Sequence, residues 1–177
     1  MRPQPDMPRI VIDTREQRPW EFPDYVQTVI GTLPTGDYAL EGDRGFAIER
    51  KSLDAFVGTL FSGWERFQRE IGRMEGAAFA AKVIIVEADY ASLMFCRDAS
   101  GQIVAPMHRH PLITPQAMAG RIADLTMMGV SMLFCRDSGH AALQAYMLLT
   151  RRAAQLKAAE PAGKNGMNYH LGSINGK

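Results

Sequence analysis

The stretch GDYALEGDRGFAIERKSLDAF, residues 36–56, crowds acidic side chains and a lysine around two short apolar runs. The runs YALEG and GFAIERK have the composition of two strands, and the segment from Glu41 to Gly45 between them predicts a hairpin turn. Ser52 is placed to cap a helix over LDAFVGTLF. Because side chains alternate along a strand, Glu49 and Lys51 are expected on the same face of this hairpin.

Segments on both sides of the hairpin predict further strands and helices. Ahead of it, RIVID at 9–13 predicts a buried strand, and DYVQTVI at 24–30 predicts a short helix capped by Asp24. Behind it, AKVIIVEA and VSMLFC predict strands, and residues 99–114 predict a long loop. Helices are expected over residues 64–74, DYASLMF, TPQAMAGRIADLTMMG and AALQAYMLLTRRAAQLKAA. This alternation predicts an α/β domain.

The composition sets the limits on domain number and partners. The chain has 177 residues, 46% of them hydrophobic, which suits one globular domain, expected over residues 1–159, followed by a Gly- and Asn-rich flexible tail at 160–177. The net charge of +1 gives no general attraction to nucleic acid, so any such affinity must come from charges arranged on one face. The sequence shows no membrane span and no signal peptide, so we expect an intracellular, cytoplasmic protein.

Four acids stand at or just past the ends of predicted strands: Asp13, Glu16, Asp37 and Glu49. Carboxylates brought together repel one another unless a cation lies among them, and oxygen ligands favour Mg²⁺ or Mn²⁺. With Lys51 on the face of Glu49, these are the groups needed to hydrolyse a phosphodiester, because a metal activates water and a lysine stabilises the developing charge. A solvated hairpin with surface ion pairs explains the same spacing, so spacing alone leaves both interpretations open.

Three ordered motifs resemble a known family. VIDTRE at 11–16, GDY at 36–38 and IERKSLDAFVGTL at 48–60 are similar to the nuclease domain of the XPF family, the structure-specific DNA endonucleases that include the archaeal Hef protein. The resemblance covers about residues 9–90 and fades beyond them. It implies a restriction-endonuclease-like α/β fold, with a central mixed sheet flanked by helices, and metal-dependent cleavage of branched or flapped DNA.

The resemblance also implies roles for single residues. Asp37 and Glu49 match the metal-binding acids of the family, and Lys51 matches its catalytic lysine. The chain departs from the family at one place, because the acid usually found four residues after that lysine is replaced by Ala55, with Asp54 one position early. Since one residue turns a helix by about 100°, Asp54 either faces elsewhere or caps the helix.

The first motif supplies the remaining site residues. Asp13 and Glu16 match family acids that support or complete the metal site, and we include Asp13 among the predicted metal ligands. Arg15 and Arg50 match its basic positions, where they pair with these acids or with phosphate. Three further arginines fall nearly on one helix face and are candidates for phosphate contacts, although solvated surface charge explains them equally well: Arg66, Arg69 and Arg73.

Partners and competing functions follow from the same reasoning. We expect branched or flapped DNA as the substrate, a homodimer formed through the apolar helices at 114–129 and 141–156, and a separate protein partner as one source of targeting. The sequence lacks the pattern of a helix-hairpin-helix module or a helicase, which favours a stand-alone nuclease. A catalytically silent scaffold subunit and a sequence-specific restriction-type nuclease are the alternatives.

Overall fold

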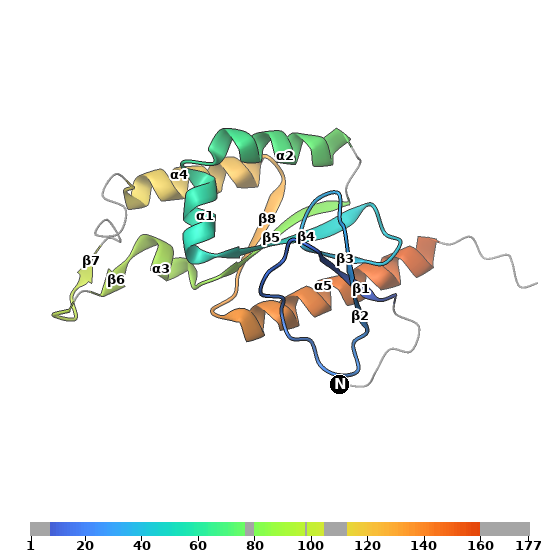
Figure 1. The fold of residues 1–177 in the computed structure, drawn as a ribbon. Coiled ribbons are helices and arrows are strands. Elements are labelled where there is room, and N and C mark those ends of the chain that lie inside the picture. The colour runs from blue at the N-terminus through green and yellow to red at the C-terminus, as the bar shows by residue number, and fades with distance from the viewer. Residues whose placement is uncertain (1–7, 77–79, 98, 105–112, 160–177) are drawn as a thin grey trace, which may run out of the picture.

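The computed structural model describes residues 8–76, 80–97, 99–104 and 113–159. Its main element is a six-stranded sheet in the order β2-β1-β3-β4-β5-β8 (Figure 1). The strands of this sheet are β1 (Ile10–Asp13), β2 (Thr28–Gly31), β3 (Tyr38–Leu40), β4 (Phe46–Ser52), β5 (Ala81–Glu87) and β8 (Val130–Phe134). The predicted tail at 160–177 lies outside the described residues.

The sheet is mixed, as predicted. Strand β1 runs parallel to β2 and antiparallel to β3, and β3 and β4 form the predicted antiparallel hairpin. Strands β4, β5 and β8 run parallel to one another. The carboxyl ends of β1, β4 and β5 and the amino end of β3 therefore lie at the same end of the sheet. The polar residues of the sequence motifs lie at this end.

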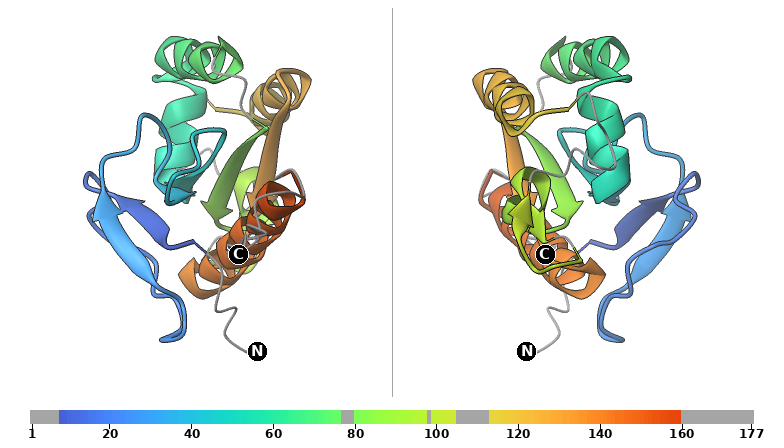
Figure 2. Two further views of the ribbon diagram at one scale, coloured as in Figure 1. Left: turned by 90° about the vertical axis from the view of Figure 1, so that its right-hand side faces the viewer. Right: turned by 90° about the vertical axis from the view of Figure 1, so that its left-hand side faces the viewer.

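Helices cover both faces of the sheet (Figures 1 and 2). On one face, α1 (Leu53–Leu60), α2 (Trp64–Gly76) and α4 (Pro115–Met127) bury a core that includes Phe56 and Leu125. On the other face, α5 (Ser138–Ala159) buries Tyr146 and Leu149 against β1, β3 and β5. The short helix α3 (Tyr90–Met94) follows β5. Helices α4 and α5 lie on either side of the edge strand β8 (Figure 2).

Local signals in the sequence explain where the helices begin. The hydroxyl of Ser52 accepts a 3.3 Å hydrogen bond from the backbone N–H of Ala55, and α1 begins at the next residue, Leu53. Thr114 accepts a 3.1 Å hydrogen bond from the N–H of Ala117 in the same way at the start of α4. The predicted cap at Ser52 is thereby confirmed, and Thr114 caps the helix that was predicted from residue 114 onward.

Two predictions of secondary structure were wrong. The segment 24–30 does not form a helix, because Thr28–Gly31 is strand β2 and pairs with β1 from Ile10↔Thr28 to Asp13↔Gly31. The segment 99–114 is not loop throughout, because β7 (Ile103–Val104) pairs with β6 (Cys96–Arg97) in a separate two-stranded sheet. Residues 105–112 of this segment lie outside the described part of the chain.

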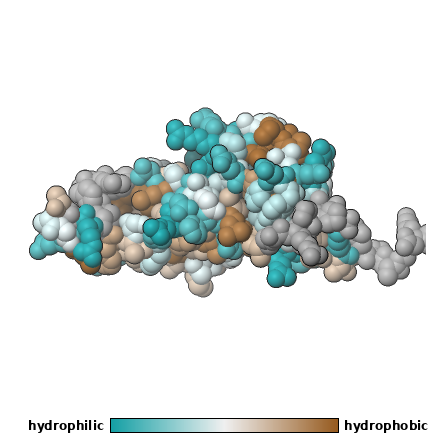
Figure 3. All heavy atoms as spheres, turned by 90° about the horizontal axis from the view of Figure 1, so that it is seen from below, coloured by the Kyte–Doolittle hydropathy of each residue, from teal (hydrophilic) through white to brown (hydrophobic). Residues whose placement is uncertain are grey.

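The surface combines polar side chains with scattered apolar ones. Seen from below, apolar side chains form separate patches between hydrophilic ones (Figure 3). Among the residues that the structure describes, the most exposed large apolar one is Met127, at the end of α4, with 86% of its surface accessible. Within the described residues, no helix is both long and apolar enough to cross a membrane.

Candidate active site

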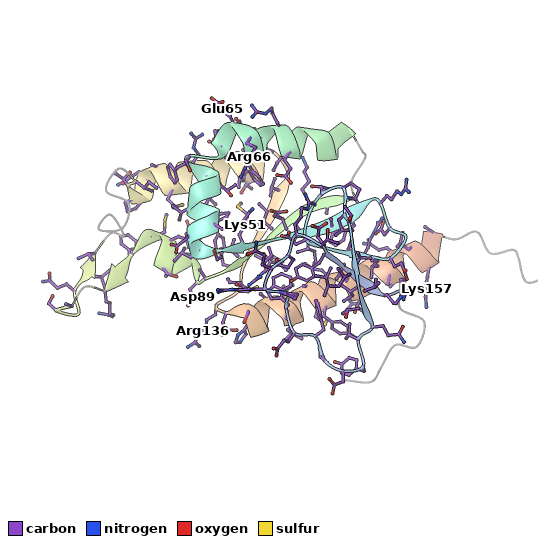
Figure 4. The ribbon with its side chains drawn as sticks, viewed as in Figure 1. Lys51, Glu65, Arg66, Asp89, Arg136 and Lys157 are labelled. Carbon is purple, nitrogen blue, oxygen red and sulfur yellow. The ribbon has the colours of Figure 1, made fainter. Side chains whose placement is uncertain are left out.

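Glu49 and Lys51 form an ion pair near the end of β4. Lys51 Nζ lies 2.7 Å from Glu49 Oε1, and the two side chains are 18% and 14% exposed, respectively. Lys51 lies where β4 runs into α1 (Figure 4). Both side chains leave the strand on one face, and that of Arg50 between them leaves on the other. The sequence predicted this shared face, and the ion pair confirms it.

Asp37 joins this pair from the neighbouring chain segment. Its backbone N–H donates to the carbonyl of Ile48 at 2.8 Å, and its Oδ2 accepts a 2.7 Å hydrogen bond from the N–H of Arg50. Gly36 makes the approach possible, because it has a φ of 75° and a Cβ there would lie 2.8 Å from the Cβ of Ala47. The sequence Gly-Asp is therefore needed to lay a carboxylate against β4.

The surroundings of Asp37 disfavour its negative charge. Burial, followed by the negative charge of Glu49, raises the pKa of Asp37 to about 7, against the opposing effect of the hydrogen bond from the Arg50 N–H. The charge of Glu16 also raises this pKa, and that of Lys51 lowers it. Two carboxylates thus share one poorly solvated place, which a cation would stabilise.

The residues at this place suit a hard divalent cation. Mg²⁺ is commonly held by one or two carboxylates and keeps several of its waters, so Asp37 and Glu49 form a sufficient protein ligand set. Mn²⁺ accepts the same oxygen donors. Within the described part of the chain, no group of three or more His, Cys, Asp or Glu side chains is arranged to hold a metal ion. The fit therefore depends on two carboxylates, with water and substrate as the remaining ligands.

Asp13, which we expected among the ligands, is engaged by other groups. Its side chain is fully buried and accepts hydrogen bonds from the backbone N–H of Arg15 at 2.9 Å, from Arg15 Nε at 2.6 Å and Nη2 at 3.2 Å, and from the N–H of Leu33 at 2.7 Å. The Arg15 guanidinium, against the effect of burial, lowers the pKa of Asp13 to about 2. Asp13 remains adjacent to the site, since its N–H donates to the carbonyl of Asp37 at 2.9 Å.

Arg15 interacts electrostatically with the carboxylate pair, and its Nη2 also donates to the carbonyl of Leu33 at 3.0 Å. Asp13 has the largest effect in raising the pKa of Arg15, and the negative charges of Asp37 and Glu49 raise it further. The Arg15 side chain is 66% exposed. It is therefore fixed at one end by Asp13 and is open to an anion bound next to Asp37 and Glu49.

Arg50 lies in a network on the opposite face of β4. Its Nη1 lies 3.0 Å from Glu16 Oε1 and also donates to the carbonyl of Arg18. Its Nε and Nη2 donate to the two oxygens of Glu87 at 2.9 and 3.0 Å. Of the two predicted partners for Arg50, acids and phosphate, the structure shows acids. Sequence reasoning missed Glu87, although the acid that ends a buried strand is the signal that identified Asp13.

The remaining predicted residues lie around this centre. Arg66 and Arg69 are exposed on α2, and the side chain of Arg73 lies outside the described part of the structure. Helix α2 is tied to the segment ahead of Asp37 by a 3.3 Å hydrogen bond from Thr35 to Glu70. Asp54 is exposed in the first turn of α1.

A mixed sheet flanked by helices, with two carboxylates, a lysine and an arginine where its strands end, is the arrangement predicted for an α/β nuclease of the restriction-endonuclease-like class. Residues 12–148 match the family model of the ERCC4 domain, so the chain belongs to the ERCC4 domain family and is an XPF-type nuclease domain. The resemblance stated from the three sequence motifs is thereby confirmed, and so is the predicted fold class.

Solved structures show the same fold. The chain is similar to XPF from Aeropyrum pernix in complex with DNA, at 23% sequence identity and a TM-score of 0.58, over 84% of this chain and 66% of that chain. It is also similar to a second structure of XPF from Aeropyrum pernix, at 25% identity and a TM-score of 0.54, over 85% of this chain and 69% of that one. No curated protein matches the sequence.

Proposed function

We propose that this domain is a metal-dependent DNA endonuclease that acts on its own on branched or flapped DNA. The observation that carries the proposal is the meeting of Asp37, Glu49 and Lys51 at the end of β4, with both carboxylates partly buried. Nucleases of the ERCC4 family are generally metal-dependent, which supports the assignment. Cleavage of such DNA would give the protein a role in DNA repair or recombination.

The residues divide the work of phosphodiester hydrolysis. Asp37 and Glu49 would hold Mg²⁺ or Mn²⁺, which when bound lowers the pKa of a coordinated water and polarises the phosphate. Lys51, 2.7 Å from Glu49, is placed to donate to a phosphate oxygen and stabilise the charge that develops there. The oxygen of water forms the new bond to phosphorus as the bond to the sugar oxygen breaks, leaving a phosphate monoester and a hydroxyl group.

The first motif would position the substrate. Asp13 is buried and holds Arg15 by two side-chain hydrogen bonds. We therefore assign Asp13 the role of orienting this arginine and not that of a metal ligand. Arg15 then contacts a phosphate of the DNA strand. Glu16 and Arg50 form a 3.0 Å ion pair that holds the loop after β1 against β4. The proposed site thus gives a role to each of Asp13, Arg15, Glu16 and Arg50.

Binding of DNA and of a second copy belongs to the same proposal. The relative from Aeropyrum pernix that was solved in complex with DNA supports DNA as the partner. The edge strand β8, flanked by α4 and α5, is the surface on which we place the homodimer. Arg66 and Arg69 on α2 are exposed and would contact phosphates outside the cleavage site. A separate protein partner would be a second means of bringing the nuclease to its DNA substrate.

Incubation with Mg²⁺ and a panel of flap, fork, single-stranded and plain duplex DNAs tests the proposal. Cleavage of the flap and fork substrates, and its loss in the double variant Asp37→Asn/Glu49→Gln, is the expected result. Cutting of plain duplex at one sequence would instead identify a restriction-type nuclease. Tight binding without cutting by the parent chain would identify a scaffold subunit.

A further inference from the structure

Glu87, the last residue of β5, uses both carboxylate oxygens on two partners from distant parts of the chain. It accepts hydrogen bonds from Arg50 at 2.9 and 3.0 Å, in a two-point pairing of carboxylate with guanidinium. Its Oε1 also accepts a 2.5 Å hydrogen bond from the indole Nε1–H of Trp20. The side chains of Arg50 and Glu87 are only 16% and 13% exposed, so water competes weakly for these bonds.

Trp20 closes the other side of this pair. Its ring is stacked on that of Tyr38, with centroids 4.3 Å apart and an angle of 14° between the planes. The Tyr38 hydroxyl also accepts a 2.8 Å hydrogen bond from the backbone N–H of Trp20. The Arg50 guanidinium carbon lies 5.8 Å from the centre of the Trp20 ring. Trp20 is 4% exposed, so its contacts fix it as part of the core and leave no face for stacking on a base.

Arg50 transmits this arrangement to the proposed metal ligands. Its side chain is held on one face of β4 by Glu87, while its backbone N–H holds the carboxylate of Asp37 at 2.7 Å. Glu49 and Lys51 are its neighbours along the strand and lie on the opposite face. A rotation of β4 about its own axis at Arg50 would therefore move all three site residues relative to one another.

We propose that Glu87, with Trp20, is a positioning residue for the cleavage reaction, which orients β4 through Arg50 so that Asp37, Glu49 and Lys51 converge. This inference rests on the proposed function and adds to it a residue from β5. Glu87 does not touch the substrate in this proposal, because its oxygens are committed to Arg50 and Trp20 on the far face of the strand.

The test compares Glu87→Gln with the parent chain in two measurements. The amide keeps the size of the side chain but loses the charge and one of the two acceptor oxygens. We expect kcat on a flap substrate to fall about tenfold with KM for DNA unchanged within about twofold, and the dissociation constant for Mn²⁺, measured by calorimetry without DNA, to rise about tenfold. Trp20→Phe, which removes the indole N–H together with part of the stacked ring but keeps an aromatic side chain, should change both quantities less and should not add to Glu87→Gln.

Asp43→Asn is the matched control. Asp43 forms the same two-point pairing with Arg152, at 2.7 and 3.0 Å, and the Arg152 side chain is 16% exposed, as that of Arg50 is. Asp43 precedes the start of β4 at Phe46, whereas Lys51 is near its end, about 16 Å further along the strand. This variant should lower the melting temperature like Glu87→Gln but leave kcat and Mn²⁺ affinity unchanged.

The outcomes separate this inference from the proposed function. Equal kcat and equal Mn²⁺ affinity in Glu87→Gln and the parent, with only a lower melting temperature, would make Glu87 a structural residue and overturn the inference. A parent chain that cuts none of the DNAs contradicts the proposed function, and the Mn²⁺ comparison then decides the inference by itself. A parent that binds no Mn²⁺ overturns both.

Discussion

The backbone N–H of Arg50 lies 2.7 Å from Oδ2 of Asp37 and donates a hydrogen bond to it. The residue between Glu49 and Lys51 thus holds the third member of the proposed site. Its side chain does a different task, since it binds Glu16 and Glu87 on the opposite face of the strand. One strand residue therefore joins the carboxylates of the site to the core beneath them.

Asp37→Asn should abolish cleavage without harming the fold. The amide oxygen keeps the hydrogen bond from Arg50, but the metal loses a charged ligand, so the rate should fall about 100-fold or more. In buffer with a chelator the melting temperature should stay equal or rise, because a buried negative charge beside Glu49 is removed. Glu49→Gln should abolish cleavage as well. Gel assays of flap cleavage and thermal melts check both, and near-normal cutting by either variant contradicts the metal site.

Lys51→Ala should separate binding from chemistry. Lys51 is paired with Glu49 and 18% exposed, and we assign it to stabilising charge that develops only in the transition state. We expect kcat to fall about 100-fold with the dissociation constant for flap DNA unchanged within about threefold. Single-turnover cleavage and fluorescence anisotropy in Ca²⁺ measure the two effects. Equal losses in both would make Lys51 a phosphate anchor.

The buried pair of Asp43 and Arg152 should make stability depend on acid pH. Burial raises the pKa of Asp43, but the hydrogen bonds from Arg152 and from the N–H of Gly45 outweigh it, so this pKa lies below its ordinary value of 3.8. The unfolded chain then binds the proton more readily, and the stability that the pair supplies is present above about pH 4 and is lost as the pH falls through the lowered pKa.

Asp43→Asn measures this contribution directly. At pH 7 it should lower the free energy of unfolding by about 3 kcal/mol, because Arg152 is left without its charged partner. The difference from the parent should shrink between pH 5 and pH 3 in urea denaturation. Glu41→Gln, in the exposed pair with Arg9, is the comparison and should change stability much less, because water and salt screen that pair. A difference that stays constant down to pH 3 would contradict the assignment.

Local patterns predicted most of the fold, and a nonlocal one was missed. The caps at Ser52 and Thr114 depend on residues three positions away, and both are present. The segment at 24–30 has apolar residues at Tyr25, Val26, Val29 and Ile30, which fit a helix as well as a strand. Pairing with β1 decides for the strand, and β1 lies more than ten residues earlier in the chain. Periodicity alone could not supply that partner.

The same distinction applies to the site. Glu49 and Lys51 were predicted to share a face because only the alternation along one strand was needed. The partners of Asp13 and Arg50 could not be predicted, because each has several acids or bases within reach of its strand. The structure pairs Arg50 with Glu87, which is 37 residues away, and Asp13 with Arg15, which is two residues away. Chain spacing does not rank such choices.

The homodimer prediction needs a test at a residue that does not belong to the monomer core. Four apolar residues of the two helices on which it rested fill the monomer core, since Met118, Leu125, Tyr146 and Leu149 are 0–3% exposed. A charge at Leu149 would therefore unfold the chain. Met127, 86% exposed beside the edge strand β8, is the better site. Met127→Glu should convert a species of about twice 19.6 kDa into a monomer in sedimentation at micromolar concentration.

Leu143→Glu is the control for this surface. Leu143 is 56% exposed on α5, but it lines a hollow with Phe22 and Tyr25, away from β8. The variant should leave the dimer intact. A parent chain that sediments as a monomer would contradict the dimer, and a dimer broken by Leu143→Glu alone would move the interface to the hollow beside residues 21–25.

The arginines of α2 should bind the DNA backbone without reading its shape. Arg66 and Arg69 are exposed, and their helix is anchored by Glu70 to Thr35, two residues ahead of Asp37, so both lie on a helix that flanks the site. A phosphate contact releases counterions, so each arginine removed should make the negative slope of log K against log salt concentration shallower by about 0.9. The affinity for flap, fork and plain duplex should fall by the same factor, because phosphates carry no structural information beyond charge.

Arg44→Ala is the control for this prediction. Arg44 is exposed in the turn at the far end of β4, so this variant should leave the slope unchanged. A slope unaltered in Arg66→Ala/Arg69→Ala, measured by anisotropy from 50 to 300 mM salt, would show that these arginines are only solvated charge.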